Sequence, residues 1–530
     1  MSRVVVLIAI LLSLPLFGLL IPFFTEGSSP AAQELSRQGT LLHLWQHVLG
    51  GYVTSTLLLL VGVGAGVFIL GVGNAWLVAN YQFPGKKLFE WALILPLAIP
   101  TYVMAYLFVD ILQFSGPVQT TLRQLLGVET LWFFPDPRSL GGAMWSFSFC
   151  LFPYVYLIAR TAFLDRSGRL SEAAETLGYS GFQAFYRLVL PMARPAIFAG
   201  MALALMEVMA DYGAVAYFGV ETFATGIFRA WLSFSDRLAA VQLSLGLLVF
   251  VLLIFYIEQT NRARMRYVSS GVVQRAVPPR RLRGKKAFWA FAVCGATLLC
   301  SFLLPVAALI KLLVEQGLSL DARYLDWLQN SFGLSAMTAL ISVACALLLA
   351  YGARLTKSPT LHWVNRLLGL GYALPGAVLA VGILSLLGLF GVAWIMSATV
   401  SVLIYAYLIR FLSSSLQSVE AGLSRITPSM DGTAALLGAT PLQTMRAIHF
   451  PLLKRSVLTA GLFVFVDVMK ELPATLLLRP FNFDTLAVAT YQLAADERLA
   501  ELALPSLTIV IAGLIPVILL SRAMSKTNRY

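Results

Sequence analysis

Charged residues are scarce in this chain. Asp, Glu, Lys and Arg make up 12% of its 530 residues, and apolar side chains make up 59%. A soluble globular chain carries roughly 25% charged residues, so this composition excludes an ordinary soluble domain. The mean hydropathy of +0.81 agrees with that exclusion. The sequence therefore indicates a protein with many membrane-spanning segments.

Catalytic and metal-binding motifs are also absent. The four cysteines and four histidines show neither metal-ligand spacing nor a disulfide framework. The sequence contains no H-E-x-x-H, no G-x-S-x-G and no G-x-x-x-x-G-K-[ST]. We therefore expect no catalytic site, no metal site and no cofactor bound by this chain, which is not an enzyme and cannot hydrolyse ATP by itself.

Long apolar runs are what the sequence has in abundance. A helix that spans a membrane needs ~20 mostly apolar residues, and continuous runs predict helices rather than a barrel. The sequence predicts an all-α polytopic membrane protein with about twelve spans. They are 4–23, 52–79, 91–113, 141–163, 196–218, 239–257, 288–314, 331–353, 367–390, 392–412, 456–478 and 502–521. The first run resembles a signal peptide, but its length and the lack of an A-x-A site favour an uncleaved anchor.

The positive charges predict the orientation. Most of the 38 Lys and Arg residues fall in segments that are cytoplasmic if both termini are cytoplasmic. The densest basic segment, 258–287, reads as a cytoplasmic linker that also suits contact with anionic lipid. The net charge of +13 is thus explained by topology, and no nucleic-acid partner is needed.

The second half of the sequence repeats the first. Gly178 and Gly438 lie 260 residues apart, as do Pro191 and Pro451. This period predicts two homologous six-helix halves in parallel orientation, 1–257 and 288–530, joined by the linker 258–287.

Each half carries an amphipathic cytoplasmic segment between its fourth and fifth spans, 171–195 and 431–455. In the first, Ser171 is a predicted N-cap, Gly178 ends a short helix, and Pro191 ends a second one. In the second, Gly438 ends the first helix and Thr440 caps the next. One such segment could lie on the lipid surface, but two at matched places favour a docking element for a two-fold partner.

These segments resemble the EAA loop of ABC importer permeases, with the pattern E-A-A, three residues, G, nine residues, I-x-L-P. The first copy matches it at Glu172, Ala173, Ala174, Gly178 and Pro191. The second keeps Ala434, Gly438 and Pro451, departs from it at Gly432 and Thr433, and has an acid one residue early, Asp431. The resemblance implies a type I importer permease fold. It also implies that both loops couple to a separate ATP-hydrolysing subunit, which uses the ATP.

A narrower resemblance concerns the solute. The runs "VMADYGAVAYFGVETFATG" and "VMKELPATLLLRPFNFDTLA" look like those of fused ferric-iron permeases. That likeness implies an ATPase homodimer, a periplasmic substrate-binding protein and the bacterial inner membrane. A permease for thiamine or another small solute is the alternative. A different class, an ATP-independent channel or secondary transporter, would not need duplicated docking segments.

Four acids fall within the matched fifth and eleventh spans: Glu207, Asp211, Asp467 and Glu471. An ionisable residue at membrane depth is costly and is a functional candidate. Each pair is spaced i, i+4 and shares a helix face, and carboxylates suit a hard cation such as ferric iron. The first interpretation is that these acids line the translocation path. The second is that they pair with Lys470, Arg410, Arg160 or backbone groups and fix the packing.

Overall fold

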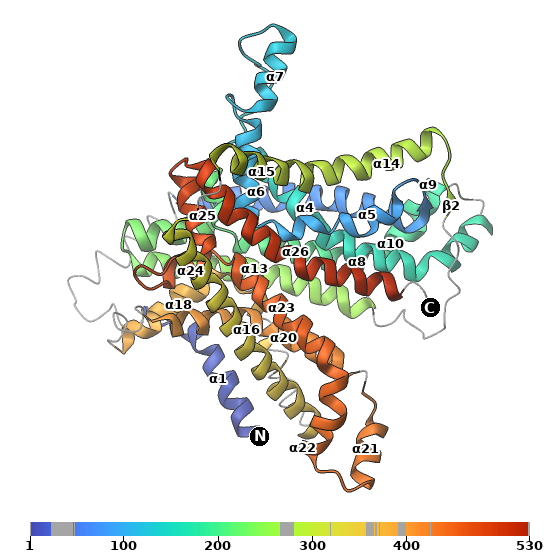
Figure 1. Cartoon of the computed structure of the whole chain (residues 1–530), viewed down its shortest axis with the longest axis vertical. Helices are drawn as coiled ribbons and strands as arrows, with labels where there is room; N and C mark the ends of the chain where they lie inside the picture. The colour runs from blue at the N-terminus through green and yellow to red at the C-terminus, as the bar shows by residue number, and fades with distance from the viewer. Residues whose placement is uncertain are drawn as a thin grey trace. The chain divides into compact units, whose positions relative to one another are not determined.

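The fold is all-α, as predicted, in a computed structural model that describes most of the chain (Figure 1). The described residues are 2–22, 46, 48–176, 179, 181–265, 280–317, 320–356, 365, 368–369, 371–390, 399–424 and 426–527. Within them, strand structure is limited to two residue pairs, β1 (Tyr81–Gln82) and β2 (Arg280–Arg281). These pair in parallel, so the end of the basic segment 258–287 is tied to the turn after α4.

The described residues contain eight helices long and apolar enough to cross a membrane, or nine if one bent pair counts as a span. The eight are Leu49–Asn80, Leu140–Leu164, Phe185–Ala210, Arg237–Thr260, Lys285–Gln316, Ala322–Arg354, Val400–Leu423 and Leu499–Leu519. Shorter helices fall in the remaining predicted spans, so every predicted span contains helical residues. The prediction of a polytopic helical membrane protein is confirmed.

Four predicted spans are not straight continuous helices. The span 367–390 is interrupted at Pro375, between Gly371–Ala373 and Gly376–Leu389. The span 91–113 is bent by 97° where the segment Lys86–Ala98 meets Thr101–Leu126. Pro100 lies at this bend. Because proline has no backbone N–H to donate, it interrupts the hydrogen bonding of a continuous helix. The spans 196–218 and 456–478 each break at an acid, Asp211 and Glu471. Hydropathy alone did not separate these breaks from continuous helix.

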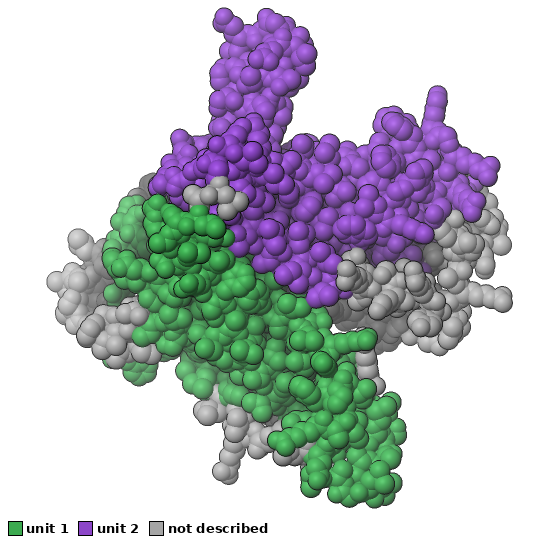
Figure 2. All heavy atoms as spheres, in the orientation of Figure 1, with its two compact units in different colours: residues 1–41, 227–245, 320–489 green, residues 42–226, 246–319, 490–530 purple. Residues whose placement is uncertain are grey.

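The chain divides into two compact units, drawn green and purple in Figure 2. Unit 1 comprises residues 1–41, 227–245 and 320–489, and unit 2 comprises 42–226, 246–319 and 490–530. Each unit therefore takes segments from both predicted halves. The predicted sequence division into 1–257, 258–287 and 288–530 concerns the repeat rather than these units, and it stays a prediction.

Unit 1 is built on the helices of the second predicted half, together with the first helix of the chain. Its elements are α1 (Ser2–Gly18), η4 (Arg229–Ser233), α16 (Ala322–Thr356), η6 (Gly371–Ala373), α18 (Gly376–Leu389), α20 (Val400–Leu423), α21 (Pro428–Leu436), α22 (Pro441–Thr444), η7 (Met445–His449), α23 (Phe450–Lys470) and α24 (Pro473–Leu478). Three helices run from one unit into the other: α12 (Phe223–Phe228), α13 (Arg237–Met265) and α25 (Leu486–Ala495).

Unit 2 is built on the helices of the first predicted half, together with the first and last long helices of the second. Its elements are α4 (Leu49–Asn80), β1, α5 (Lys86–Ala92), η2 (Leu95–Ala98), α6 (Thr101–Leu112), α7 (Pro117–Leu126), α8 (Leu140–Thr176), α9 (Gly181–Ala184), η3 (Phe185–Val189), α10 (Leu190–Ala210), α11 (Gly213–Tyr217), β2, α14 (Lys285–Leu298), η5 (Leu299–Leu303), α15 (Leu304–Gln316) and α26 (Leu499–Thr527).

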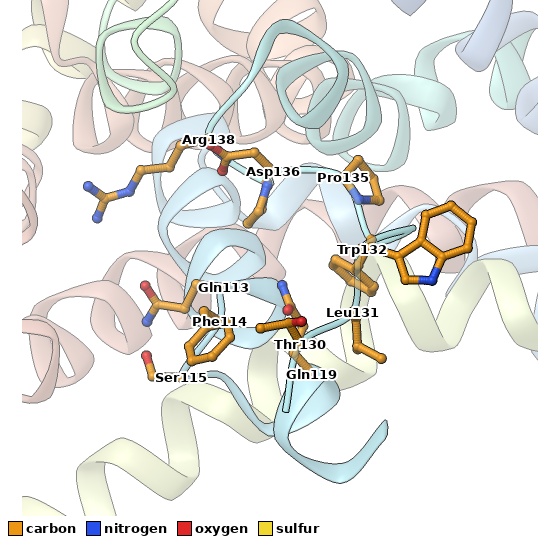
Figure 3. A pocket seen from close by; sticks show the side chains of 12 residues that line it. Gln113, Phe114, Ser115, Gln119, Thr130, Leu131, Trp132, Pro135, Asp136 and Arg138 are labelled. Atoms are coloured by element: carbon orange, nitrogen blue, oxygen red, sulfur yellow. The ribbon is translucent and has the colours of Figure 1, made fainter. Parts of the chain in front are cut away.

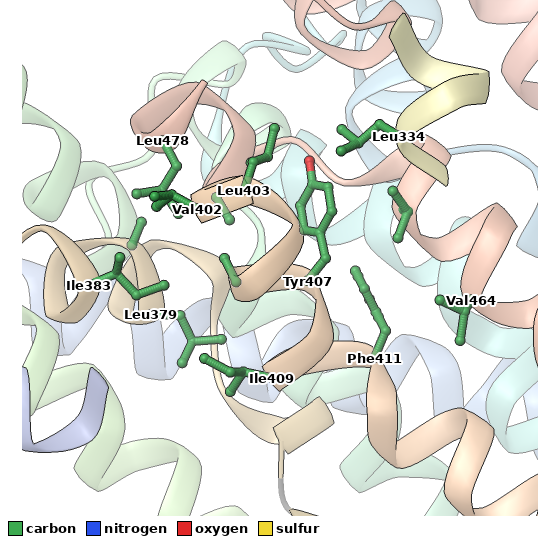
Figure 4. Packing of buried hydrophobic residues seen from close by; sticks show 14 of the residues in the cluster. Leu334, Leu379, Ile383, Val402, Leu403, Tyr407, Ile409, Phe411, Val464 and Leu478 are labelled. Carbon is green, nitrogen blue, oxygen red and sulfur yellow. The ribbon is translucent and has the colours of Figure 1, made fainter. Parts of the chain in front are cut away.

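Packing in unit 1 depends on apolar side chains and on one close helix contact. Figure 4 shows Leu379, Val402, Phe411 and Val464, from α18, α20 and α23, gathered in one buried cluster. The helix α1 packs on α18, and a Cβ at Gly18 would lie 2.1 Å from the backbone oxygen of Gly382. Small residues let helix backbones approach this closely in membrane proteins.

In unit 2, the most extensive packing between two helices joins α4 to α8. A Cβ at Gly66 would lie 2.0 Å from Ser148 Oγ, and one at Gly71 would lie 2.6 Å from Val155 Cβ. The glycines therefore set the distance between these two helices, and α10 packs against both of them.

The segment between α6 and α8 projects from the rest of unit 2 as α7 and its flanking loops (Figure 1). Arg123 organises it, donating to the carbonyl oxygens of Phe114 at 2.8 Å and Gln119 at 3.3 Å. A groove of about 570 Å³ lies here, lined by residues between Gln113 and Arg138 (Figure 3).

Local structure repeats along the chain. The helices α10 and α23 both have 21 residues and start 260 residues apart. Each follows a five-residue π turn, η3 or η7, with the same offset. The helices α6 and α18 both follow a proline, Pro100 and Pro375, 275 residues apart.

Candidate functional site

Two of the four predicted acids lie at the point where a long helix ends. Asp211 follows α10 and Glu471 follows α23, and both take extended backbone, with ψ of 133° and 121°. Each carboxylate accepts an N–H from the first turn of the next short helix, Ala214 at 2.8 Å and Ala474 at 3.0 Å. A carboxylate near a helix N-terminus is stabilised by the helix dipole, so these acids hold the break in each helix.

Glu471 is neutralised by a buried cation. Arg410 Nη1 on α20 lies 2.8 Å from Glu471 Oε1, and the two side chains are 9% and 1% exposed. The hydroxyl and the N–H of Thr475 donate to Glu471 Oε2 at 2.8 and 3.1 Å. Gly376 leaves room for the pair, since a Cβ there would lie 2.5 Å from Glu471 Oε1. This geometry is the one expected for an acid that fixes packing.

Asp211 has different surroundings. The Thr101 hydroxyl donates to Asp211 Oδ2, and among the described residues no Lys or Arg pairs with this carboxylate. The register of Arg410 in the repeat is occupied by Cys150, 260 residues earlier, whose thiol lies 3.4 Å from the carbonyl oxygen of Ile99. Equivalent acids of the two copies are therefore balanced in different ways.

Glu207 and Asp467 lie one helical turn before these acids, and both are half-buried. Glu207 interacts electrostatically with Asp211. Of the basic partners considered for the four acids, Arg410 pairs with Glu471, whereas Arg160 lies 3.6 Å from Glu90. The Glu207–Asp211 pair belongs to unit 2 and the Asp467–Glu471 pair to unit 1.

The first amphipathic segment departs from its predicted local structure. Glu172, Ala173 and Ala174 lie inside α8, which runs unbroken to Thr176, so Ser171 does not cap a new helix. Gly178 lies outside the described residues. Pro191 does not end a helix either, because the π turn η3 precedes it and Leu190 N–H bonds to the Phe185 carbonyl. The wider turn accommodates a residue that has no N–H, and the helix continues as α10.

The second segment matches its predicted local structure more closely. Gly438 has φ of +76°, which confirms it as the left-handed stop after α21. Thr440 Oγ1 accepts the Gln443 N–H at 3.3 Å, and Gln443 Oε1 accepts the Thr440 N–H at 2.8 Å. This reciprocal capping box fixes the start of α22. Pro451, like Pro191, follows a π turn and lies in the first turn of a continuing helix.

Asp431 anchors α21 to the rest of unit 1. Arg354, at the end of α16, donates to Asp431 Oδ2 at 2.6 Å from Nη2, and His449 Nε2 lies 2.7 Å from Oδ1. Burial raises the pKa of Asp431, but the hydrogen bonds and charges of Arg354 and His449 together outweigh it, so the net shift is downward. Ala434 is buried on the same helix. The acid that stands one residue early in the motif thus has a defined structural partner.

The same region exposes large apolar side chains. Leu436 and Leu437, at the end of α21, are 89% and 82% exposed. In the first copy, Tyr186 is 67% exposed. The neighbouring Leu436 and Leu437 are therefore candidates for contact with a partner.

Comparison with known proteins decides the family. Residues 71–267 match the family model of the binding-protein-dependent transport system inner membrane component. The Fe(3+)-transport system permease protein FbpB 2 of Haemophilus influenzae is 30% identical over 527 residues, which cover 97% of both chains. The chain belongs to this permease family.

Other relatives of the permease cover less of it. The molybdenum transport system permease protein ModB of Escherichia coli K12 is 31% identical over 174 residues, 33% of this chain and 71% of that protein. The sulfate transport system permease protein CysT of the same organism is 30% identical over 150 residues, 28% of this chain and 51% of that protein. The permease is thus a multi-pass component of an inner-membrane transport system, as the sequence indicated.

Sequence reasoning missed several residues that shape these sites. Arg354 and His449 meet Asp431 from 77 and 18 residues away, and no local pattern connects them. Thr101 donates its hydroxyl to Asp211 from the first position of α6, directly after Pro100.

Proposed function

We propose that this permease carries ferric iron across the inner membrane in an ATP-driven importer. The observation that carries the proposal is the similarity over nearly the full length of both chains to a permease named for Fe(3+) transport. The acids at the helix breaks agree with it, because a hard cation prefers carboxylate oxygens.

ATP is hydrolysed by separate subunits in this proposal, a homodimer that docks on the segments 171–195 and 431–455. Both termini and both segments are then cytoplasmic. The exposed Leu436 and Leu437 supply apolar contact, and the anchoring of Asp431 by Arg354 transmits force from the docked subunit to α16. Glu172, Ala173, Ala174, Gly178 and Pro191 play the corresponding part in the first copy, with Ala434, Gly438 and Pro451 in the second. A periplasmic binding protein delivers the solute on the opposite face.

The translocation path in this proposal is lined by Glu207, Asp211 and Asp467. Glu471 sits at the matched position, but its charge is balanced by Arg410, so its part is to hold the path wall. A path needs ligands that release the ion as well as bind it. Half-buried acids meet that need better than a fully enclosed set of ligands.

The solute and the energy source can be tested together. Purified permease, its ATPase and its binding protein are reconstituted in liposomes, and uptake of radioactive iron is measured with and without ATP. We expect uptake only with ATP and the iron-loaded binding protein. Uptake of thiamine instead of iron would replace the solute, and uptake driven by an ion gradient alone would replace the ABC mechanism.

Matched controls separate coupling from assembly. Gly432 and Gly438 both lie in the second segment with no atom near an added Cβ, but only Gly438 has a positive φ. Gly438→Pro should block uptake while the permease still inserts, and Gly432→Ala should leave uptake close to wild type. Normal ATPase binding and uptake in Gly438→Pro would contradict the docking role.

A further inference from the structure

Several tyrosines gather in the part of unit 2 that contains Asp211. The Tyr106 ring lies 4.5 Å from the ring of Tyr217 and 6.1 Å from that of Tyr102, between centroids. Tyr106 also interacts electrostatically with Asp211 and Tyr491. All of these residues belong to unit 2. A carboxylate and several phenol oxygens therefore share one region of the fold.

One of these phenols lacks a hydrogen-bond partner. The Tyr106 side chain is fully buried, at 0% exposure, and its hydroxyl has no donor or acceptor among the described residues. A buried hydroxyl without a partner costs about 1–3 kcal/mol. Tyr491, which interacts electrostatically with Tyr106, has its hydroxyl 3.1 Å from that of Tyr212, and both of these side chains are half-buried. The cluster thus joins an unpaired buried oxygen to oxygens nearer the surface.

The second repeat shows that packing does not need these phenols. The two repeats are aligned by placing Pro100 on Pro375 for α6 and α18, and Asp211 on Glu471 for the short helices that follow. In this alignment, four tyrosines of the first repeat have apolar counterparts in the second. Tyr102, Tyr106, Tyr212 and Tyr217 correspond to Ala377, Val381, Leu472 and Leu477. The register is supported by Thr101 and Gly376, which both approach the acid of their own repeat.

The two repeats also differ in the charged groups around their matched acids, Asp211 and Glu471. In the second repeat the buried guanidinium of Arg410 balances Glu471. In the first repeat Cys150 takes the place of that arginine, and Asp211 and Glu207 share one region without a paired Lys or Arg among the described residues. The acids of the first repeat therefore keep their negative charge unbalanced within the described part of the chain, whereas Arg410 balances the charge of Glu471 in the second repeat.

We propose that Asp211, with the phenol oxygens of Tyr106 and Tyr212, is a transient ligand site for a hard trivalent cation on its way through the permease. This inference rests on the proposed iron transport. Carboxylate and phenolate are hard anionic oxygen donors that suit such a cation. Each phenol that binds releases its proton to water, so the charge of the ion is offset as it enters. Arg410 makes the equivalent place in the second repeat unavailable to a cation.

The test uses the whole purified permease in lipid nanodiscs, titrated with ferric nitrilotriacetate. A phenolate bound to ferric iron gives a charge-transfer absorption in the visible range, which carboxylates alone do not give. We expect this band in the wild type and a clear loss of intensity in Tyr106→Phe and in Tyr212→Phe. Asp211→Asn should weaken the apparent affinity for ferric iron by more than about tenfold, because even the loss of a residue that only orients a metal ligand costs about that much.

Tyr256→Phe is the matched control, since Tyr256 lies on α13 and is 67% exposed. It should leave both the band and the affinity unchanged. A wild-type permease that imports iron with ATP but shows no band would overturn the site and leave the transport function standing. A permease that imports another solute and no iron would overturn the function itself. A band that survives in the double variant Tyr106→Phe with Tyr212→Phe would place the ligands elsewhere.

A second design imitates the other repeat. Cys150→Arg with Thr101→Gly builds the Arg–acid pair and the open glycine beside it, as at Arg410, Glu471 and Gly376. Because the second repeat tolerates this arrangement, we expect a folded protein that neither shows the band nor imports iron. A folded double variant that still binds and imports iron would contradict the proposed site.

Discussion

Removing the charge of Glu471 should destabilise the permease more than removing that of Asp211. Glu471→Gln leaves the Arg410 guanidinium without a counter-charge at a place where both side chains are less than a tenth exposed. Breaking a buried pair from one side costs about 3–5 kcal/mol. Asp211→Asn strands no cation, and the Thr101 hydroxyl can still donate to the amide oxygen, so its cost should be nearer 1 kcal/mol, about that of one hydrogen bond.

Thermal unfolding of both variants in one detergent, followed by intrinsic fluorescence, measures the difference. The double variant Arg410→Met with Glu471→Leu is the control, because replacing a buried pair by apolar groups of similar volume is often neutral or stabilising. It should unfold at a higher temperature than Glu471→Gln. Equal losses in Glu471→Gln and Asp211→Asn, or a Glu471→Gln variant as stable as the wild type, would refute the reasoning.

Three further outcomes are expected. Arg354 and His449 lower the pKa of Asp431, so the contribution of Asp431 to folding is complete above the unfolded pKa of 3.8 and is lost as the pH falls through the lowered pKa. Pepsin should therefore cut 428–449 more readily at the acid end of its range. Asp431→Asn should remove this dependence on pH. Gly438→Val should slow ATP-driven uptake, since a β-branched residue at a φ of +76° is strained by about 1–2 kcal/mol, and equal uptake in Gly438→Val and Gly432→Val would contradict this. Gly18→Ala should lower the unfolding temperature, because its Cβ would meet the backbone of α18, whereas Gly50→Ala has open space and should not.

Signals carried by neighbouring residues were read correctly from the sequence. The positive φ of Gly438 and the cap at Thr440 depend on four or five consecutive residues, and both were predicted. Every predicted span contains helical residues, because apolar length is also a signal carried by consecutive residues.

Contacts between distant residues could not be read in this way. Glu471 is neutralised by Arg410, 61 residues away, and Asp211 accepts a hydrogen bond from Thr101, 110 residues away. The role of Pro191 was wrong because a π turn, which has no clear sequence signal, absorbs the missing N–H. The break at Asp211 was missed because the residues on both sides of it are apolar.

The contact between α1 and α18 affects the order in which the chain can fold. Gly18 leaves the ribosome 364 residues before Gly382, whose backbone lies against it in the folded protein. At the usual rate of synthesis, about 5–20 residues per second, the wait is roughly 20–70 s. During this time Gly18 of α1 lacks its native neighbour. A nascent chain stopped before residue 376 has no α18 with which to complete this contact, so assembly of unit 1 is a late, non-local step that follows insertion.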